Sequence, residues 1–144
     1  MLKIITAAAL ASALAIPALA EGETHYVAFH VDENDPQVMN MALNNVKNVT
    51  NYYESQGDTV VVELVAYGPG LNMFVVDRSP VADRIAAMSL EMDNLSFAAC
   101  GNTHRAMISN AGKDVPLMEE ATVVPSGVVR LIELQEQDYA YVRP

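Results

Sequence analysis

The segment Thr59-Val-Val-Val-Glu-Leu-Val-Ala66 is an almost unbroken run of β-branched and aliphatic residues, and it leads into the turn Tyr67-Gly-Pro-Gly70. A strand that is exposed on one face alternates apolar and polar residues. A strand of a parallel sheet, covered on both faces, instead reads as a continuous apolar run. The segment therefore predicts a buried parallel strand and indicates an α/β protein.

Further apolar runs and helical patterns alternate on both sides of this strand. The run His25–Val31 predicts the preceding strand, and an apolar stripe at steps of three and four predicts a helix from about 36 to 55. After the turn we expect, in order, a short amphipathic piece at 71–76, a helix from Ser79-Pro80 to about Leu90, a strand at 95–99, a helix at 103–110, a strand at 122–125, a helix from Ser126-Gly127 and a last strand at 139–142. Repeated strand–helix order predicts parallel pairing, so we expect a three-layer α/β/α sandwich around a mostly parallel sheet of about five strands.

The N-terminus differs in composition from the rest of the chain. Residues 1–20 contain a positive charge at Lys3, an apolar run from Ile4 to Ile16, and small residues at Ala18 and Ala20. This pattern is typical of a secretory signal peptide, with an uncleaved membrane anchor as the alternative. We expect a signal peptide at 1–20 and a single domain at 21–144, which would work outside the cytoplasm and most simply in a periplasm.

The chain is acidic, with 18 Asp and Glu residues against 8 Lys and Arg and a formal net charge of −10. Nucleic acids and anionic membranes are bound by basic patches. The charge balance therefore argues against nucleic acid as a partner, and against a membrane once the signal peptide has been removed.

The only cysteine, Cys100, ends the apolar run 95–99 and is followed by Gly101-Asn102-Thr103, which form a turn and a candidate helix start. Ligands of open α/β sheets bind at the carboxyl ends of strands, and a helix N-terminus stabilises a thiolate. A single cysteine in an exported protein is either a reactive thiol or a buried residue that packs as a small hydrophobe. The sequence leaves both interpretations open.

In a parallel sheet the loops that follow the strands meet at one edge, which here brings together 32–35, 67–70 and 100–103. Gly68 and Gly70 give the second loop a backbone that can approach a ligand or another chain closely, or they serve the turn alone. His104 lies four residues after Cys100, so the two side chains share a helix face only if the helix includes Cys100. The three histidines form no metal set, and we expect neither a metal nor a cofactor.

The first predicted helix carries an unusual number of asparagines, which are weak helix formers. This polar face is either simply solvated or, in the interpretation we prefer, makes contacts between subunits. The residues are Asn40, Asn44, Asn45, Asn48 and Asn51.

Several segments together resemble the DsrE/DsrF-like family, including its YchN-like branch, over essentially residues 25–144. They are Phe29-His30-Val31-Asp32-Glu33, Ala42-Leu43-Asn44-Asn45-Val46-Lys47-Asn48, Val65-Ala66-Tyr67-Gly68-Pro69-Gly70, Phe97-Ala98-Ala99-Cys100-Gly101-Asn102-Thr103, Val124-Pro125-Ser126-Gly127-Val128-Val129, and Leu134-Gln135 through Tyr139-Ala140-Tyr141.

The resemblance implies an α/β/α fold that assembles into trimers or hexamers. In the sulfur-relay branches of this family, a cysteine in an exposed loop carries sulfane sulfur as a persulfide between donor and acceptor proteins. The matching position here is Cys100, and only this residue is carried over from the family. From their place at the same sheet edge, the candidate supporting-loop residues are Gly101, Asn102, Thr103, Gly68 and Gly70. The alternative is a non-catalytic oligomeric binding or scaffolding module. An exposed thiol would favour the carrier, and a thiol buried beneath Met or Val side chains would favour the scaffold.

Overall fold

The computed structural model describes residues 22–144. The elements are β1 (Thr24–Val31), α1 (Pro36–Ser55), β2 (Thr59–Ala66), the 3₁₀ helix η1 (Gly68–Phe74), α2 (Ala82–Glu91), β3 (Leu95–Cys100), α3 (Gly101–Ala111), β4 (Ala121–Val124), α4 (Gly127–Glu136) and β5 (Ala140–Val142). The predicted alternation of strands and helices is confirmed.

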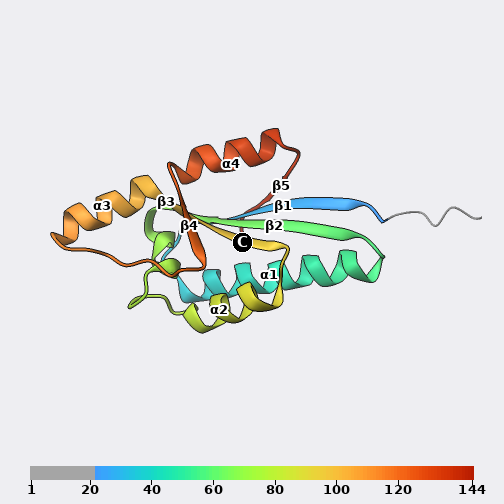
Figure 1. Cartoon of the computed structure of the whole chain (residues 1–144), viewed down its shortest axis with the longest axis horizontal. Coiled ribbons are helices and arrows are strands. Elements are labelled where there is room, and N and C mark those ends of the chain that lie inside the picture. The colour runs from blue at the N-terminus through green and yellow to red at the C-terminus, as the bar shows by residue number, and fades with distance from the viewer. Residues whose placement is uncertain (1–21) are drawn as a thin grey trace, which may run out of the picture.

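All five strands are parallel and lie in the order β4-β3-β2-β1-β5. Helices α1 and α2 cover one face of the sheet and α4 covers the other, while α3 extends beyond the edge at which the strands end (Figure 1). The predicted three-layer sandwich with a sheet of five strands is therefore confirmed. The central strand β2 is buried on both faces, as its continuous apolar run predicts.

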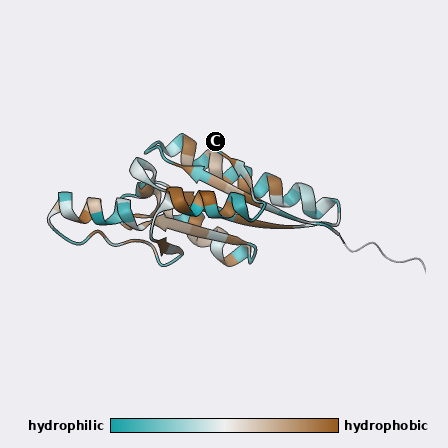
Figure 2. Ribbon diagram, turned by 90° about the horizontal axis from the view of Figure 1, so that it is seen from above, coloured by the Kyte–Doolittle hydropathy of each residue, from teal (hydrophilic) through white to brown (hydrophobic). Residues whose placement is uncertain are grey.

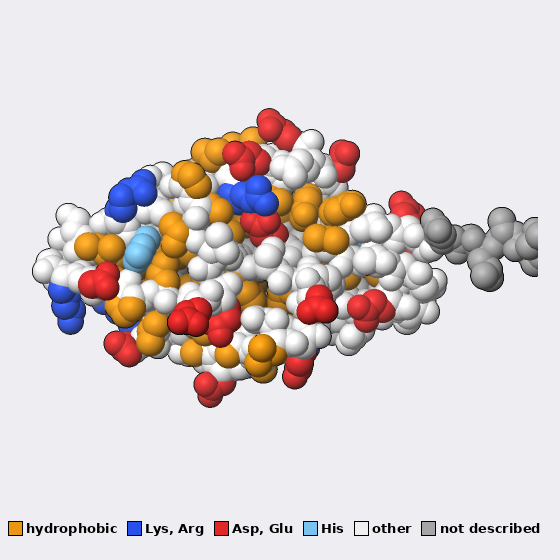
Figure 3. Space-filling model, viewed as in Figure 1, with side chains coloured by type: hydrophobic (Ala, Val, Ile, Leu, Met, Phe, Trp, Pro, Cys, Tyr) orange, Lys and Arg blue, Asp and Glu red, His pale blue; other side chains and the backbone are white. Residues whose placement is uncertain are grey.

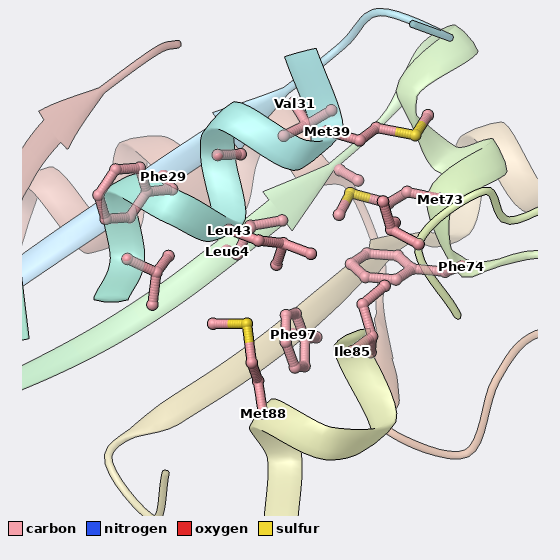
Figure 4. Packing of buried hydrophobic residues seen from close by; sticks show 14 of the residues in the cluster. Phe29, Val31, Met39, Leu43, Leu64, Met73, Phe74, Ile85, Met88 and Phe97 are labelled. Atoms are coloured by element: carbon pink, nitrogen blue, oxygen red, sulfur yellow. The ribbon is translucent and has the colours of Figure 1, made fainter. Parts of the chain in front are cut away.

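The larger core lies between the sheet and helices α1 and α2. It includes Phe29, Leu64 and Phe97 from adjacent strands, which pack against residues such as Leu43 and Met88 from the helices (Figure 4). A smaller cluster under α4 contains Ala28, Val65, Ala98, Leu131 and Leu134. The hydropathy colouring shows hydrophobic residues along the strands and in the first half of α4 (Figure 2).

Glu63 is the one charged residue of β2, and its side chain faces α4. Both of its carboxylate oxygens accept hydrogen bonds of 2.7 Å from Arg130, through Nε and Nη2. A bidentate pair of this kind compensates much of the cost of burying a carboxylate. The pair therefore anchors α4 to the centre of the sheet.

Two helix starts differ from the sequence prediction. Helix α2 begins at Ala82 rather than at Ser79-Pro80, because the Ser79 hydroxyl donates to the Met73 carbonyl and accepts from the Val81 amide. Helix α3 begins at Gly101 rather than at Thr103, which makes Cys100 its N-cap residue. The second difference places the thiol at the helix start.

The predicted signal peptide lies outside the described residues. Within residues 22–144, no helix is both long enough and apolar enough to span a membrane.

Gly70 lets η1 pack directly against the end of β1. A Cβ at this position would meet the Val31 carbonyl and come within 2.8 Å of the Asp32 Cα, both of which are backbone atoms that cannot rotate away. We expect Gly70→Ala to lower the free energy of unfolding by about 1–3 kcal/mol, measured by urea denaturation.

A matched control for this substitution is Gly112→Asn. Gly112 has a φ of +63°, a Cβ added to it would meet nothing within 4 Å, and asparagine tolerates this conformation. Equal losses of stability in the two variants would contradict the steric explanation for Gly70.

Candidate functional site

Three loops that follow strands meet at the carboxyl edge of the sheet, as the sequence predicts. The Tyr67 amide donates to the Val31 carbonyl at 3.3 Å, and the Gly68 amide donates to the Thr103 hydroxyl oxygen at 2.9 Å. Ala66 pairs with Ala99 in the sheet, so Tyr67 and Cys100 follow side by side on neighbouring strands. The thiol is therefore surrounded by segments from β2, β3 and the start of α3.

Cys100 occupies a position that favours an acceptor side chain. As the N-cap of α3, its Sγ accepts a hydrogen bond from the Thr103 amide at 3.5 Å. N-cap positions are normally taken by Ser, Thr, Asp or Asn, whose oxygens accept from the first amides of the helix. A thiolate accepts hydrogen bonds better than a thiol, so this position favours ionised sulfur.

A second helix N-terminus reaches the same sulfur. Gly127, the first residue of α4, lies so close that a Cβ there would stand 3.1 Å from the Cys100 Cβ and 3.0 Å from the Tyr67 Cβ. The missing side chain lets the first turn of α4 approach the thiol. Two helix N-termini, from α3 and α4, thus direct their positive ends towards one sulfur.

The surroundings of Cys100 move its pKa in opposite directions. Burial raises the pKa of the thiol, whereas hydrogen bonding from the Thr103 hydroxyl and from the amides of Thr103, Gly127 and Asn102 lowers it. The hydrogen bonds together exceed the effect of burial, so the pKa lies below its usual value.

The thiol is not open to solvent. Cys100 is only 4% exposed, whereas the family resemblance places the sulfur-carrying cysteine in an exposed loop. The sequence left the exposure of this thiol open, and the structure shows it buried. Cys100 pairs with Val124 of β4 in the sheet, and Tyr67 and Gly127 at the start of α4 lie close to it.

An aromatic cluster beside the thiol was not predicted from the sequence. The His30 ring packs on the Tyr67 ring with centroids 4.5 Å apart, and His30 Nδ1 is hydrogen-bonded to the Tyr141 hydroxyl at 2.7 Å. Burial lowers the pKa of His30 and outweighs the opposing effect of Asp32, so the site disfavours the protonated imidazole. Its Nε2 is a buried atom with no hydrogen-bond partner in the described part of the chain. Strand parity alone could have placed His30 on this face, because Ala28 and His30 alternate with the core residues Phe29 and Val31.

The other histidines point elsewhere. His104 Nε2 is hydrogen-bonded to the Val115 carbonyl at 2.7 Å, so its spacing from Cys100 does not bring imidazole to the thiol. His25 lies on the opposite face of β1 from His30, where it contacts the Asp58 carboxylate at 2.9 Å and stacks on Tyr53.

The asparagine face of α1 is partly used within the chain. Arg84 of α2 donates to the side-chain oxygens of Asn40 at 2.6 Å and Asn44 at 2.8 Å. These two residues join α1 to α2, and contacts between subunits through this face stay a prediction.

Two further features lie apart from the thiol. A groove of about 380 Å³ runs between α4 and strands β3 and β4, with the Glu63–Arg130 pair in its lining, but neither Cys100 nor Tyr67 lines it. Across residues 22–144, no group of three or more His, Cys, Asp or Glu side chains is arranged to hold a metal ion. The thiol is thus the centre of the candidate site.

The lowered thiol pKa has a consequence for stability. A thiol whose pKa is lower in the folded than in the unfolded chain stabilises the fold fully above the unfolded value, about 8.5, and this stabilisation is lost as the pH falls through the folded value. We therefore expect the difference in unfolding free energy between wild type and Cys100→Ser to be larger near about pH 9.5 than near about pH 6. Urea denaturation under reducing conditions measures it. If the difference in unfolding free energy between wild type and Cys100→Ser became smaller at high pH, the effect of burial on the thiol pKa would exceed that of the hydrogen bonds. The folded protein would then hold a neutral thiol.

Comparisons with known proteins show a similarity in sequence and fold to an uncharacterised protein. No protein-family model matches it, and no curated protein matches it. Among solved structures, it is similar to MTH1491 from Methanobacterium thermoautotrophicum, described as a protein of unknown function. The two share 32% sequence identity over 83% of this chain and 99% of MTH1491, with a TM-score of 0.70. The five-stranded parallel sheet is also consistent with the DsrE/DsrF-like fold. Because identity and fold agree over nearly the whole of the relative, this chain belongs to the same protein family as MTH1491.

Proposed function

We propose that this protein carries sulfane sulfur as a persulfide on Cys100. The observation that carries the proposal is the setting of the sulfur, which lies at the N-termini of both α3 and α4 and is hydrogen-bonded by the Thr103 amide. This setting favours the thiolate, which is the nucleophilic form of cysteine.

The chemistry needs no external oxidant. The Cys100 thiolate attacks the terminal sulfur of a donor persulfide, a new S–S bond forms, and the donor's S–S bond breaks as its thiolate leaves with the electron pair. In the second step an acceptor thiolate attacks the outer sulfur, and Cys100 departs as a thiolate. A leaving thiolate of low pKa departs faster, so the same helix N-termini assist both steps.

The resemblance to the DsrE/DsrF-like family supports this proposal, because Cys100 matches the position of the sulfur-carrying cysteine. The similarity to MTH1491 supports the fold and adds no activity, since that protein is itself described as having unknown function.

The burial of Cys100 favours a second candidate, a non-catalytic binding or scaffolding module with a structural cysteine. At 4% exposure the thiol is as buried as a core residue. If the thiol is reactive, its cover must restrict the donor, so a small inorganic polysulfide reaches it more readily than a persulfide held on a protein.

Intact-mass spectrometry after incubation with inorganic polysulfide separates the two candidates. We expect wild type to gain the mass of one sulfur atom and to lose it again when a small thiol is added. The Cys100→Ser variant should gain no mass. Cysteine is absent elsewhere in the chain, so the variant removes every thiol. Wild type that stays unmodified under native conditions, yet gains sulfur once unfolded in urea, would establish the structural role instead.

The proposal includes a periplasmic location and assembly into a trimer or hexamer. Half-exposed apolar side chains on α4 and β4 support self-association, since contiguous exposed apolar surface is typical of protein contacts. Orange side chains are visible along α4 at the top of the view in Figure 3. The half-exposed apolar residues of these two elements are Val123 of β4 and Val128, Val129 and Ile132 of α4.

Light scattering on the chain without residues 1–20 tests the assembly. We expect a trimer or a hexamer, and Ile132→Glu should shift the distribution towards monomer because it places a charge on this apolar face. A monomeric wild type at micromolar concentration would refute the proposed assembly and leave the chemistry of Cys100 untouched.

A further inference from the structure

The end of the chain closes over His30 from the open side of the sheet. The last strand, β5, has three residues, pairs with β1 and is the outermost strand on that side. From it the Tyr141 hydroxyl reaches His30 Nδ1, to which it is hydrogen-bonded at 2.7 Å. We call residues 140–144 the C-terminal latch.

The second attachment of the latch is an exposed ion pair. Arg143 Nη2 lies 2.9 Å from Asp32 Oδ1 and 3.2 Å from Glu33 Oε1, both in the loop that follows β1. Ion pairs at the surface contribute little to stability. The latch is thus held by a short edge strand, one hydrogen bond to His30 and surface charges. Segments with so few buried contacts open locally at low cost, while the rest of a protein stays folded.

The closed latch leaves one nitrogen of His30 unsatisfied. The side chain is 4% exposed, and within residues 22–144 its Nε2 is a buried atom without a hydrogen-bond partner. A neutral imidazole has one N–H donor and one acceptor nitrogen. Tyr141 occupies Nδ1, so in either tautomer Nε2 keeps an unused donor or acceptor. A buried polar group without a partner is costly, and opening of the latch would give it water.

A proton on His30 makes the closed state less favourable still. Both ring nitrogens of an imidazolium are donors, and a buried Nε2–H without an acceptor then carries part of a charge. Asp32 attracts this charge and Arg143 repels it. In the closed latch the two are also paired with each other. Opening removes Arg143 and leaves the Asp32 carboxylate free to stabilise the imidazolium.

The neighbouring elements on this face offer the imidazolium no other counter-charge. The Tyr67 ring from the end of β2 packs on the His30 ring, and burial raises the pKa of this phenol, which keeps it neutral. Arg130 of α4 is already paired with Glu63 of β2. Cys100 stands at the end of β3, two strands away from β1.

We propose that residues 140–144 form a pH-sensitive latch, which is closed over His30 when the imidazole is neutral and opens when the imidazole takes up a proton. Opening uncovers the His30 and Tyr67 rings at the carboxyl edge of the sheet, where ligands of open α/β sheets bind. The fixed end of the latch is Tyr139, whose amide donates to the Leu134 carbonyl at 3.0 Å and whose ring packs on Tyr26.

The pH range follows from the direction of the shift at His30. Burial holds the pKa of His30 below its ordinary value of 6.5 in the closed state, and an open latch returns it to that value or above. The closed latch is therefore fully stable above about pH 6.5. It loses stability as the pH falls from there towards the closed-state pKa, by at most about tenfold in the ratio of open to closed molecules per pH unit.

Hydrogen exchange of the native protein, followed by nuclear magnetic resonance, tests the latch. Protection factors remove the intrinsic pH dependence of exchange. We expect protection of the β5 amides to fall severalfold, and by up to about tenfold, between about pH 6.5 and pH 5.5, while amides between β2 and β3 keep theirs. His30→Asn cannot take up the proton and should abolish the pH dependence. The matched control is His25→Asn, on the opposite face of the same strand, which should retain it.

Protection of β5 that stays constant with pH in wild type would overturn the proposal, and so would a pH dependence that persists in His30→Asn. If His30→Asn fails to fold, wild type alone decides. The ring protons of His30 report its titration, and that titration should coincide with the loss of protection in β5. Two separate midpoints would overturn the latch.

The latch does not depend on the proposed sulfur chemistry. Cys100→Ser should open with the same midpoint as wild type, because the titrating group is His30. A midpoint that moves or disappears in Cys100→Ser would mean that the thiol is titrating, and it would overturn the latch. Absent sulfur uptake in a protein whose latch opens as expected would refute the carrier function alone.

Discussion

The parallel pairing of β2 with both β1 and β3 is the constraint on which the rest of the structure depends. Between β1 and β2 the paired residues run from Thr24 opposite Thr59 to Val31 opposite Ala66. Between β2 and β3 they run from Val62 opposite Leu95 to Ala66 opposite Ala99. Because three adjacent strands point the same way and end at nearly the same level, the loops after them lie at one edge. The thiol, the turn 67–70 and the end of β1 come together for this reason alone. An antiparallel β2 would have placed Tyr67 at the opposite edge from Cys100.

Glycine positions convert this common edge into a closely packed site. Gly70 brings η1 onto the end of β1, and Gly127 brings α4 onto Tyr67 and Cys100. The same packing has two effects on the thiol that oppose each other. It directs backbone amides at the sulfur, which favours the thiolate, and it removes the sulfur from solvent, which disfavours charge and restricts access. The net effect is a lowered pKa in a buried group.

Most of the fold follows from local patterns. The bounds of α1 and β2 agree with the sequence because Pro36 starts the helix after the Asp35 cap and because the apolar run of β2 has clear ends. The starts of α2 and α3 do not follow from such patterns. At α2 the Ser79 hydroxyl is committed to the Met73 carbonyl, a contact with the preceding 3₁₀ helix that no local pattern shows. At α3 the cap is a cysteine, which is not among the usual capping residues, so the familiar signal is absent.

The sequence by itself determined the parallel α/β fold and the place of the single cysteine at a strand end, since both depend on periodicity and order within short segments. Only the tertiary structure decided what surrounds the thiol. Tyr67, Cys100 and Gly127 are far apart in the chain, and so are His30 and Tyr141, and their contacts depend on strand register and on how closely α4 packs. Strand register and the distance of α4 from the sheet are set by the packing of the whole sheet and its helices. For that physical reason the burial of Cys100, its two helix N-termini and its link through Thr103 to Gly68 emerged only from the folded protein.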